Sequence, residues 1–435
     1  MTPGGSSPTL PPGALYPALL LLAAGLGLAL WRVRGNAARF VLIAVWLRFV
    51  MSALHQYTYP PLVAGMSLNA LASCVVFGAG LLVVRPCAWR LAAITPVFAV
   101  IGGVALSAAL SGAWSAAFSA GIKWGYFLVL LLGARQAIAR LGRARFFGFA
   151  AIAFAPPVLL QQLSLGLGVS KRADEDGGRA FIGGYEHEAA FSVALVGALF
   201  VAAQARGFPG PLRWLLVGAV VAGLVLAAYR TSLIAAAPLA GAFLIHEALG
   251  ALRRSDRPAA ALVVAALAGL GLAAAAFALR ERFADFAALA QGTDPLQRPG
   301  AYTPQEQELF SARLYLWAQY LDALVHADWR ARLFGFGPDG WQGRFATYAH
   351  NTVVGTVFEY GVFGLAALGW LWGSFAARTL RAARRAPDGL LLAAGFASFL
   401  LLNMATMAQW LVEGLILFAL VGAAVLSARE TAAAR

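Results

Sequence analysis

The sequence predicts an all-α membrane protein with about twelve transmembrane helices and one large exported loop. Of its 435 residues, 61% are hydrophobic and only 12% are charged, which is more apolar surface than a soluble domain can bury. The apolar runs are about 17–24 residues long, the length that a helix needs to cross a bilayer. Backbone groups in lipid must be paired within the protein, and the alternation of a transmembrane barrel is absent, so these runs are predicted to be helices.

The apolar runs define about 12 or 13 spans, because the limits of the first and of the last two are hard to set. We expect them near residues 14–31, 40–56, 62–84, 91–111, 114–134, 146–168, 189–205, 212–229, 231–248, 260–279, 350–374, 388–404 and 409–427. The chain starts with an uncharged stretch, so its first span is expected to be a retained anchor rather than a cleaved signal peptide. These limits divide the chain into N-terminal spans (1–279), a loop (280–349) and C-terminal spans (350–435).

The net charge of +14 resides largely in short loops between spans. The arginines gather in alternate loops, as expected for the cytoplasmic side, which also places the C-terminus there. They are Arg32, Arg34, Arg39, Arg85, Arg90, Arg135, Arg140, Arg143, Arg145, Arg206, Arg213, Arg253, Arg254, Arg257, Arg378, Arg381, Arg384 and Arg385. The charge therefore predicts topology among membrane lipids and not nucleic-acid binding. The two cysteines, Cys74 and Cys87, indicate neither a disulfide nor a metal site.

Three regions are predicted to face the opposite side: the polar segment 171–188, the tight turn at Arg230 and the loop 280–349. In that loop, Thr303-Pro304-Gln305-Glu306 forms a capping box with proline at the first helical position. Apolar residues at helical spacing up to Leu324 predict one amphipathic helix that starts at this cap. Arg313 is expected to project from its apolar face, where a guanidinium needs an anionic partner.

His350 stands where the loop meets the next span, with Asn351 directly after it. One interpretation is an interfacial histidine that anchors or caps a helix. The chemical interpretation is a general base, because imidazole titrates near neutrality and accepts a hydroxyl proton. Nearby arginines would help to keep it unprotonated, because like charge disfavours the imidazolium.

Several other charged residues have both a plain and a functional interpretation. Arg230 either reaches lipid headgroups or binds phosphate, for which the guanidinium offers a planar fork. Arg179, in the exported segment 171–188, is a further candidate for such a contact. Lys123 lies within a span, where a charge is unfavourable. It therefore either contacts an anionic lipid headgroup or pairs with an internal acid such as Glu413.

A metal site is not expected. His187 stands between Glu186 and Glu188, but three successive side chains cannot all converge on one ion. Arg230, Arg313 and His350 map to one membrane face and offer two cations and one base. This set suits glycosyl transfer from a pyrophosphate-linked donor without a cofactor. The arginines would stabilise the departing diphosphate in place of a metal, and the base would activate an acceptor hydroxyl.

This pattern resembles the O-antigen ligase family, within the superfamily that also holds O-antigen polymerases and bacterial protein O-oligosaccharyltransferases. The resemblance covers residues 179–365. Its features are Arg230 at the exported start of a span, Arg313 in Ser311-Ala312-Arg313-Leu314-Tyr315-Leu316-Trp317, the turn Leu333-Phe334-Gly335-Phe336-Gly337, and His350-Asn351 followed by Gly361-Val362-Phe363-Gly364-Leu365. The sequence departs from the family at Tyr229, where a small residue is more frequent, and at His187 with its flanking glutamates, where an asparagine is more usual.

The resemblance implies a helical membrane glycosyltransferase of the C type in the bacterial inner membrane, with its site facing the periplasm. It implies a donor glycan on undecaprenyl pyrophosphate and an acceptor sugar on lipid A–core. It also implies a metal-independent reaction that inverts the anomeric carbon. His350 would be the base. The residues expected to contact substrate are Arg230, Arg313, Arg179, Asn351 and Lys123.

Two kinds of alternative stay open. Within the superfamily, they are an O-antigen polymerase and a protein O-oligosaccharyltransferase, of which the short C-terminal tail disfavours the second. Outside it, the alternative is a twelve-helix transporter or lipid flippase. Transporters commonly show internal repeats and polar sites near the middle of the membrane. Here no repeat is evident, and most polar candidates lie at one membrane face.

Overall fold

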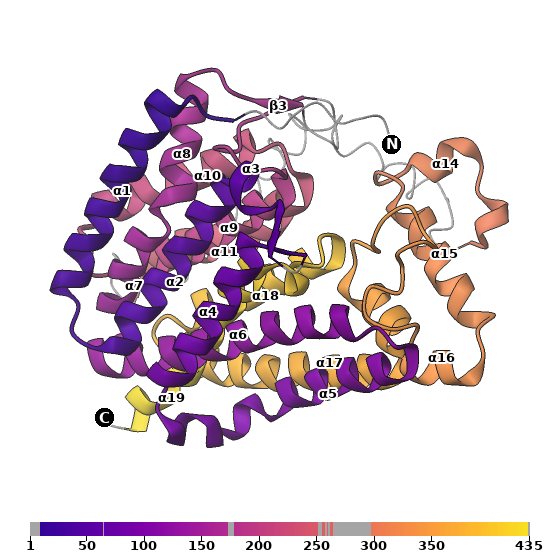
Figure 1. The fold of residues 1–435 in the computed structure, drawn as a ribbon. Coiled ribbons are helices and arrows are strands. Elements are labelled where there is room, and N and C mark those ends of the chain that lie inside the picture. Colours follow the sequence, from indigo (N-terminus) through magenta and orange to yellow (C-terminus); the bar gives the residue numbers. More distant parts are fainter. Residues whose placement is uncertain are drawn as a thin grey trace.

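A computed structural model describes residues 9–63, 65–172, 178–250, 255–256, 259, 262–263 and 297–433, with side chains up to residue 428. Within these ranges the protein is a bundle of helices, with two short antiparallel strand pairs (Figure 1). The predicted all-α class is therefore confirmed. The predicted span 260–279 lies outside the described residues, apart from residues 262–263.

The N-terminal half of the bundle contains the following elements: α1 (Pro12–Arg32), α2 (Asn36–Ala53), α3 (His55–Thr58), β1 (Pro61–Val63), β2 (Met66–Ser67), α4 (Leu68–Val83), η1 (Pro86–Arg90), η2 (Ala92–Ile94), α5 (Thr95–Ser111), α6 (Trp114–Leu141), α7 (Arg143–Ala153), α8 (Ala155–Gly166), β3 (Lys171–Arg172), β4 (Arg179–Ala180), α9 (Glu188–Gln204), α10 (Gly210–Leu226) and α11 (Arg230–Gly250). The predicted span 146–168 consists of α7 and α8, which meet at Phe154. Prolines in the first turn of α8 suit a helix start there.

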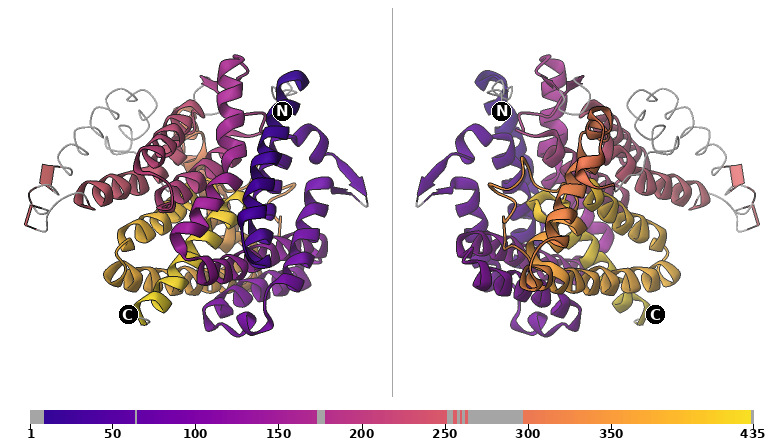
Figure 2. Two further views of the ribbon diagram at one scale, coloured as in Figure 1. Left: turned by 90° about the vertical axis from the view of Figure 1, so that its left-hand side faces the viewer. Right: turned by 90° about the vertical axis from the view of Figure 1, so that its right-hand side faces the viewer.

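The C-terminal part begins with η4 (Pro299–Ala301), α14 (Pro304–Glu308), α15 (Arg313–Val325) and α16 (Trp329–Phe334). It continues with α17 (Thr352–Arg385), α18 (Gly389–Ala405), η5 (Ala408–Trp410) and α19 (Val412–Ala433). Figures 1 and 2 place α14, α15 and α16 against one side of the bundle.

Twelve apolar helical segments in the described ranges correspond to predicted spans. Seven segments are long and apolar enough to cross a membrane, and five more apolar helices are 10–17 residues long. Large apolar side chains point away from the bundle, among them Leu20 on α1 and Leu82 on α4, which is 89% exposed. Such exposure is unfavourable in water and suits a surface that faces lipid. The chain is therefore a polytopic α-helical membrane protein.

The centre of the bundle is formed by α6 and α19. Phe418 of α19 stacks on Phe127 of α6 and on Phe399 of α18, with ring centroids 4.9 Å and 4.4 Å apart. One ion pair lies within this core, because the Glu413 carboxylate accepts from Arg48 Nε at 2.9 Å. Ser52 donates to the same carboxylate. The pairing is what makes two buried charges tolerable there.

One prediction for the loop is wrong. The capping box at Thr303 and Glu306 is present, but the helix that it starts ends at Glu308. Residues 310–312 all have left-handed backbone angles, which no α-helix accommodates, and a new helix begins at Arg313. Leu309 and Arg313 therefore do not lie on one helix face. Arg313 instead occupies the first turn of α15.

Candidate active site

The backbone in front of His350 is held by two aromatic side chains of α15. Trp317 Nε1 donates to the Ala349 carbonyl at 2.7 Å, and the Tyr320 hydroxyl donates to the Thr347 carbonyl at 2.8 Å. The Tyr320 ring is buried and stacks on Phe345 at 4.1 Å. Tyr320 belongs to a small core with Phe358 and Met407, and Trp317 packs against a second one, so α15 fixes the position of the histidine.

Behind His350, the chain turns directly into α17. Asn351 caps this helix, since its Oδ1 accepts from the backbone N–H groups of Val353 and Val354 at 2.9 Å and 3.2 Å. Its Nδ2 donates to the Met404 carbonyl at 3.0 Å, which ties the cap to the end of α18. The Asn351 amide is therefore engaged in the fold. The substrate contact proposed for it from the sequence stays a prediction.

The imidazole of His350 is partly buried beside an aromatic ring and a cation. The Tyr348 ring centroid lies 4.1 Å from that of His350. Burial, and secondly the positive charge of Arg313, lower the pKa of His350 to about 4. The imidazole is thus neutral near pH 7 and has a nitrogen lone pair for a proton. From the sequence, arginines were expected to lower the pKa of His350, but burial lowers this pKa more than Arg313 does.

Arg313 connects the histidine to the turn between α10 and α11. Its Nη2 donates to the Tyr229 hydroxyl at 3.3 Å, and its guanidinium lies 5.9 Å from the centre of that ring. The same cation lowers the pKa of His350 and opposes the rise in the pKa of Tyr348 that burial causes. Arg313 therefore lies between Tyr229 on one side and the pair Tyr348 and His350 on the other.

Arg230 is the first residue of α11, and its side chain reaches the junction between α14 and α15. The connection from α10 is only residues 227–229, so the predicted tight turn is present. Arg230 Nη2 donates to the Ser311 hydroxyl at 3.3 Å. Two contacts thus join the turn at 229–230 to residues 311–313. The structure brings together the three residues that the sequence analysis grouped, through Ser311, Tyr229 and Tyr348.

Backbone strain gathers around these residues. In the described chain, left-handed backbone angles occur at seven residues other than glycine: Ala228, Phe310, Ser311, Ala312, Asp339, His350 and Met407. This conformation costs a residue with a Cβ about 1–2 kcal/mol. The strained residues include the candidate base, the three residues directly before Arg313, and Ala228, two residues before Arg230. Such strain persists only where the surrounding structure enforces it, and it is typical of functional sites.

Lys123, on α6, lies apart from this group in a cavity of about 190 Å³ that also contacts Asp339, Glu359 and Tyr348. Glu413, which the sequence suggested as its partner, pairs with Arg48 instead. Lys123 forms no ion pair among the described residues. The substrate contact predicted for Lys123 stays a prediction.

Arg179 and His187 are not joined to the group by any hydrogen bond between described residues. Arg179 is exposed and lies in β4, whose Cα partner is Arg172 in β3. His187 precedes α9 with its side chain 63% exposed, 3.8 Å from Glu186. In the part of the chain that the structure describes, no three His, Cys, Asp or Glu side chains form a metal-binding group. The substrate contact of Arg179 stays a prediction.

Comparison with known families supports the resemblance. Residues 214–369 match the family model described as O-antigen ligase. The match shows a similarity of this segment, which is just over a third of the chain. It contains Arg230, Arg313 and His350, whereas Arg179 and Lys123 lie before it. No curated protein matches the chain.

Two glycine motifs of the O-antigen ligase segment meet each other in the structure. Gly361 has a φ of 66° and kinks α17. The kink leaves the carbonyls of Phe358 and Glu359 free to accept from the N–H groups of Phe336 and Gly337, at 2.9 Å and 3.0 Å. A Cβ at Gly335 would collide with the backbone of α17. Glycine is therefore required here for close approach and for the left-handed angle.

Three residues that link the candidate site were not expected from the sequence to take part in it: Tyr229, Ser311 and Tyr348. Each directly adjoins or nearly adjoins a residue that was singled out. Tyr229 was noted only as a departure from the family, yet its hydroxyl receives the hydrogen bond from Arg313. This contact accounts for a large residue at a position where a small one is more frequent.

Proposed function

We propose that the protein transfers a glycan from undecaprenyl pyrophosphate to a sugar hydroxyl of lipid A–core in the bacterial inner membrane, on the periplasmic side and without a metal. The observation that carries this proposal is the linked group of two arginines and a neutral histidine within the O-antigen ligase segment. The contacts Arg230–Ser311 and Arg313–Tyr229 join the two cations, and the field of Arg313 reaches His350.

In the proposed reaction, the acceptor hydroxyl oxygen attacks the anomeric carbon of the donor sugar. A new glycosidic C–O bond forms while the bond from that carbon to the diphosphate oxygen breaks, and the electron pair leaves with undecaprenyl pyrophosphate. His350 takes the hydroxyl proton. Arg230 and Arg313 stabilise the charge on the leaving diphosphate through charge-assisted hydrogen bonds. Attack opposite the leaving group inverts the anomeric carbon.

The low pKa of His350 fits this sequence of events. Before the donor binds, burial and Arg313 keep the imidazole unprotonated. A bound diphosphate would neutralise the field of Arg313 and raise the pKa of His350, because opposite charge favours the imidazolium. The base would thus become stronger only when the donor is in place.

The test is reconstitution of the purified protein with an undecaprenyl-pyrophosphate-linked glycan and lipid A–core, with and without a chelator. We expect transfer to lipid A–core at the same rate in both conditions. Loss of transfer in chelator, with restoration by magnesium or manganese, would contradict the arginine-only mechanism. No transfer to lipid A–core, with lengthening of the lipid-linked glycan instead, would identify an O-antigen polymerase.

In cells, the complementary test is lipopolysaccharide profiling of a ligase-null strain that expresses the protein. We expect long O-antigen on lipid A–core with the wild-type chain. With His350→Ala, long polymer should accumulate on the lipid carrier, because polymerisation would be intact and only the final transfer lost.

A further inference from the structure

A cavity of about 190 Å³ adjoins the candidate active site through Tyr348. We call it the Lys123 cavity. It is lined by α6, by the loop before His350, by the kinked part of α17 and by η5 with its flanking residues. Liquid water occupies about 30 Å³ per molecule, so this space is ample for a ring-sized polar group. Tyr348 is also the residue whose ring lies 4.1 Å from that of His350.

Hydrogen bonds hold the wall of the Lys123 cavity in place. The kink at Gly361 exposes the Glu359 carbonyl, which accepts from Gly337 N–H at 3.0 Å and from the Ser107 hydroxyl at 2.7 Å. The loop then turns back, with Gly340 N–H donating to the Gly337 carbonyl at 3.0 Å. Asp339 has a φ of 55° at the tip of this turn. These bonds set the Asp339 and Glu359 side chains beside one cavity.

The Lys123 cavity brings one amine together with two carboxyl groups, those of Asp339 and Glu359. Yet Lys123 Nζ makes no hydrogen bond or ion pair with any described residue. The indole Nε1 of Trp410, in the same wall, is also without an acceptor in the described part of the chain. Unmet donors beside two carboxylates indicate a polar occupant.

Aromatic rings cover much of the remaining wall. Trp341 and Tyr348 form one pair with ring centroids 6.1 Å apart, and Tyr360 and Trp410 form another at 5.4 Å. The cavity therefore combines apolar ring surface with donors and acceptors at its edge. A pyranose has the matching surface, with C–H groups on its faces and hydroxyls around its rim.

We propose that the Lys123 cavity binds one sugar unit of the acceptor saccharide, and this inference rests on the proposed function. Hydroxyls both donate and accept, so they can meet the ammonium and the carboxylates together. A cavity that holds an amine and carboxyl groups together favours a neutral ligand that both donates and accepts hydrogen bonds over a phosphate or a divalent cation. The arginines proposed to bind the donor diphosphate, Arg230 and Arg313, do not line this cavity. A sugar in the cavity would therefore present the attacking hydroxyl from the Tyr348 side.

The test is steady-state kinetics of the purified protein with undecaprenyl-pyrophosphate-linked glycan as donor and lipid A–core as acceptor. Lys123→Met should raise the acceptor KM by about 10-fold or more, as loss of a charged hydrogen bond does, and leave the donor KM within about 2-fold. Trp341→Ala should act in the same direction. Its matched control is Trp329→Ala, on α16, whose side chain is 63% exposed and outside the cavity.

The outcomes distinguish a failure of the acceptor-site inference from a failure of the proposed function. If the wild-type protein transfers glycan to lipid A–core but both variants keep its acceptor KM, the cavity does not hold the acceptor and the proposed function stands. A higher donor KM with an unchanged acceptor KM also overturns the inference. If the wild-type protein does not transfer, both are wrong. Thermal unfolding in detergent checks the fold, and Trp341→Ala decides the question if Lys123→Met is unfolded.

Discussion

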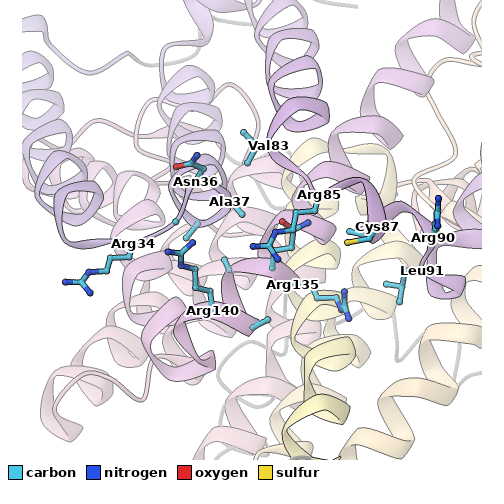
Figure 3. Close-up of a pocket in the computed structure, with 16 residues that line it drawn as sticks. Arg34, Asn36, Ala37, Val83, Arg85, Cys87, Arg90, Leu91, Arg135 and Arg140 are labelled. Carbon is cyan, nitrogen blue, oxygen red and sulfur yellow. The ribbon is translucent and has the colours of Figure 1, made fainter.

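Arginines gather in two regions of this molecule, and the two regions differ in how their backbone is built. Arg34, Arg85, Arg90, Arg135 and Arg140 line a cavity of about 1000 Å³ at the ends of α1, α4 and α6 (Figure 3). We call this region the basic end. Among the residues that the structure describes, none that lines this cavity is acidic. The candidate active site instead places two arginines beside tyrosine, serine and histidine. The two regions are well separated, because Lys123 and Arg140 lie about 25 Å apart along α6.

Strain distinguishes the two regions more clearly than charge does. At the basic end, left-handed angles occur at Gly35 and Gly142, which tolerate them. Around the candidate site and the adjoining Lys123 cavity, residues with a Cβ adopt such angles, including three in succession before Arg313. Their total cost, several times about 1 kcal/mol, is comparable with the net stability of a domain. An arginine by itself can indicate either membrane topology or a functional site. In this molecule, the arginines of the candidate active site are the ones that lie next to strained backbone.

The most direct test of this difference between the basic end and the candidate active site is a substitution of His350. We expect His350→Ala to lower the transfer rate by about 10²–10⁴, because a general base contributes that much. The control is His326→Ala, whose side chain is 74% exposed on the C-terminal side of α15 and should leave the rate unchanged. Both are measured by transfer to lipid A–core with correctly inserted protein. Equal activity of the two variants would remove His350 from the mechanism.

Arginine-to-lysine pairs test whether the two regions use their cations differently. Arg313→Lys should lower kcat by about 10-fold or more, since lysine keeps the charge but loses the planar fork for phosphate. Arg230→Lys should be impaired for the same reason. Arg85→Lys at the basic end should behave like the wild-type protein, because a topological role needs only positive charge. A loss with Arg85→Lys as large as with Arg313→Lys would abolish the distinction.

Much of the fold was predictable because the length and hydropathy of spans are local properties. The spans at α1, α9 and α18 lie within a few residues of their predicted limits. The grouping of Arg230, Arg313 and His350 was also predictable, since Arg230 and His350 stand where polar segments meet apolar runs and Arg313 lies in the exported loop between them. The break before Arg313 was not, because Phe310, Ser311 and Ala312 have no sequence feature that demands left-handed angles. The Lys123 cavity was not either, since it depends on a kink that brings α17 against a distant loop.

The pH dependence of transfer should separate the free protein from its donor complex. The free His350 pKa is about 4, so kcat/KM should stay level as the pH falls from 8 and decline only near that value. The acid limb of kcat should lie at higher pH, because a bound diphosphate raises the pKa of the base. If the acid limbs of kcat and kcat/KM lie at the same pH, Arg313 does not pair with the diphosphate in the way proposed.

The same shift has a consequence for stability. Because the folded pKa lies below the usual 6.5, the unfolded chain binds a proton at His350 more readily between these values. His350 therefore destabilises the fold progressively as the pH falls from about 6.5 to about 4, and has no such effect above that window. The unfolding temperature of His350→Gln should accordingly fall less on acidification than that of the wild-type protein.

The smallest expected effect tests strain itself, by changing an alanine to glycine in each region. Ala312 has a φ of 63°, so Ala312→Gly should relieve strain and stabilise the fold by about 0.5–1 kcal/mol after the added flexibility of the unfolded chain is counted. Ala377, exposed on α17 toward the basic end, is right-handed and helical. Ala377→Gly should destabilise the fold by about 1 kcal/mol. Unfolding in detergent measures both. If strain positions Arg313, Ala312→Gly should also lower kcat, because a looser junction holds the guanidinium less firmly. A variant that is more stable and equally active would show that the strain is structural and not part of the site.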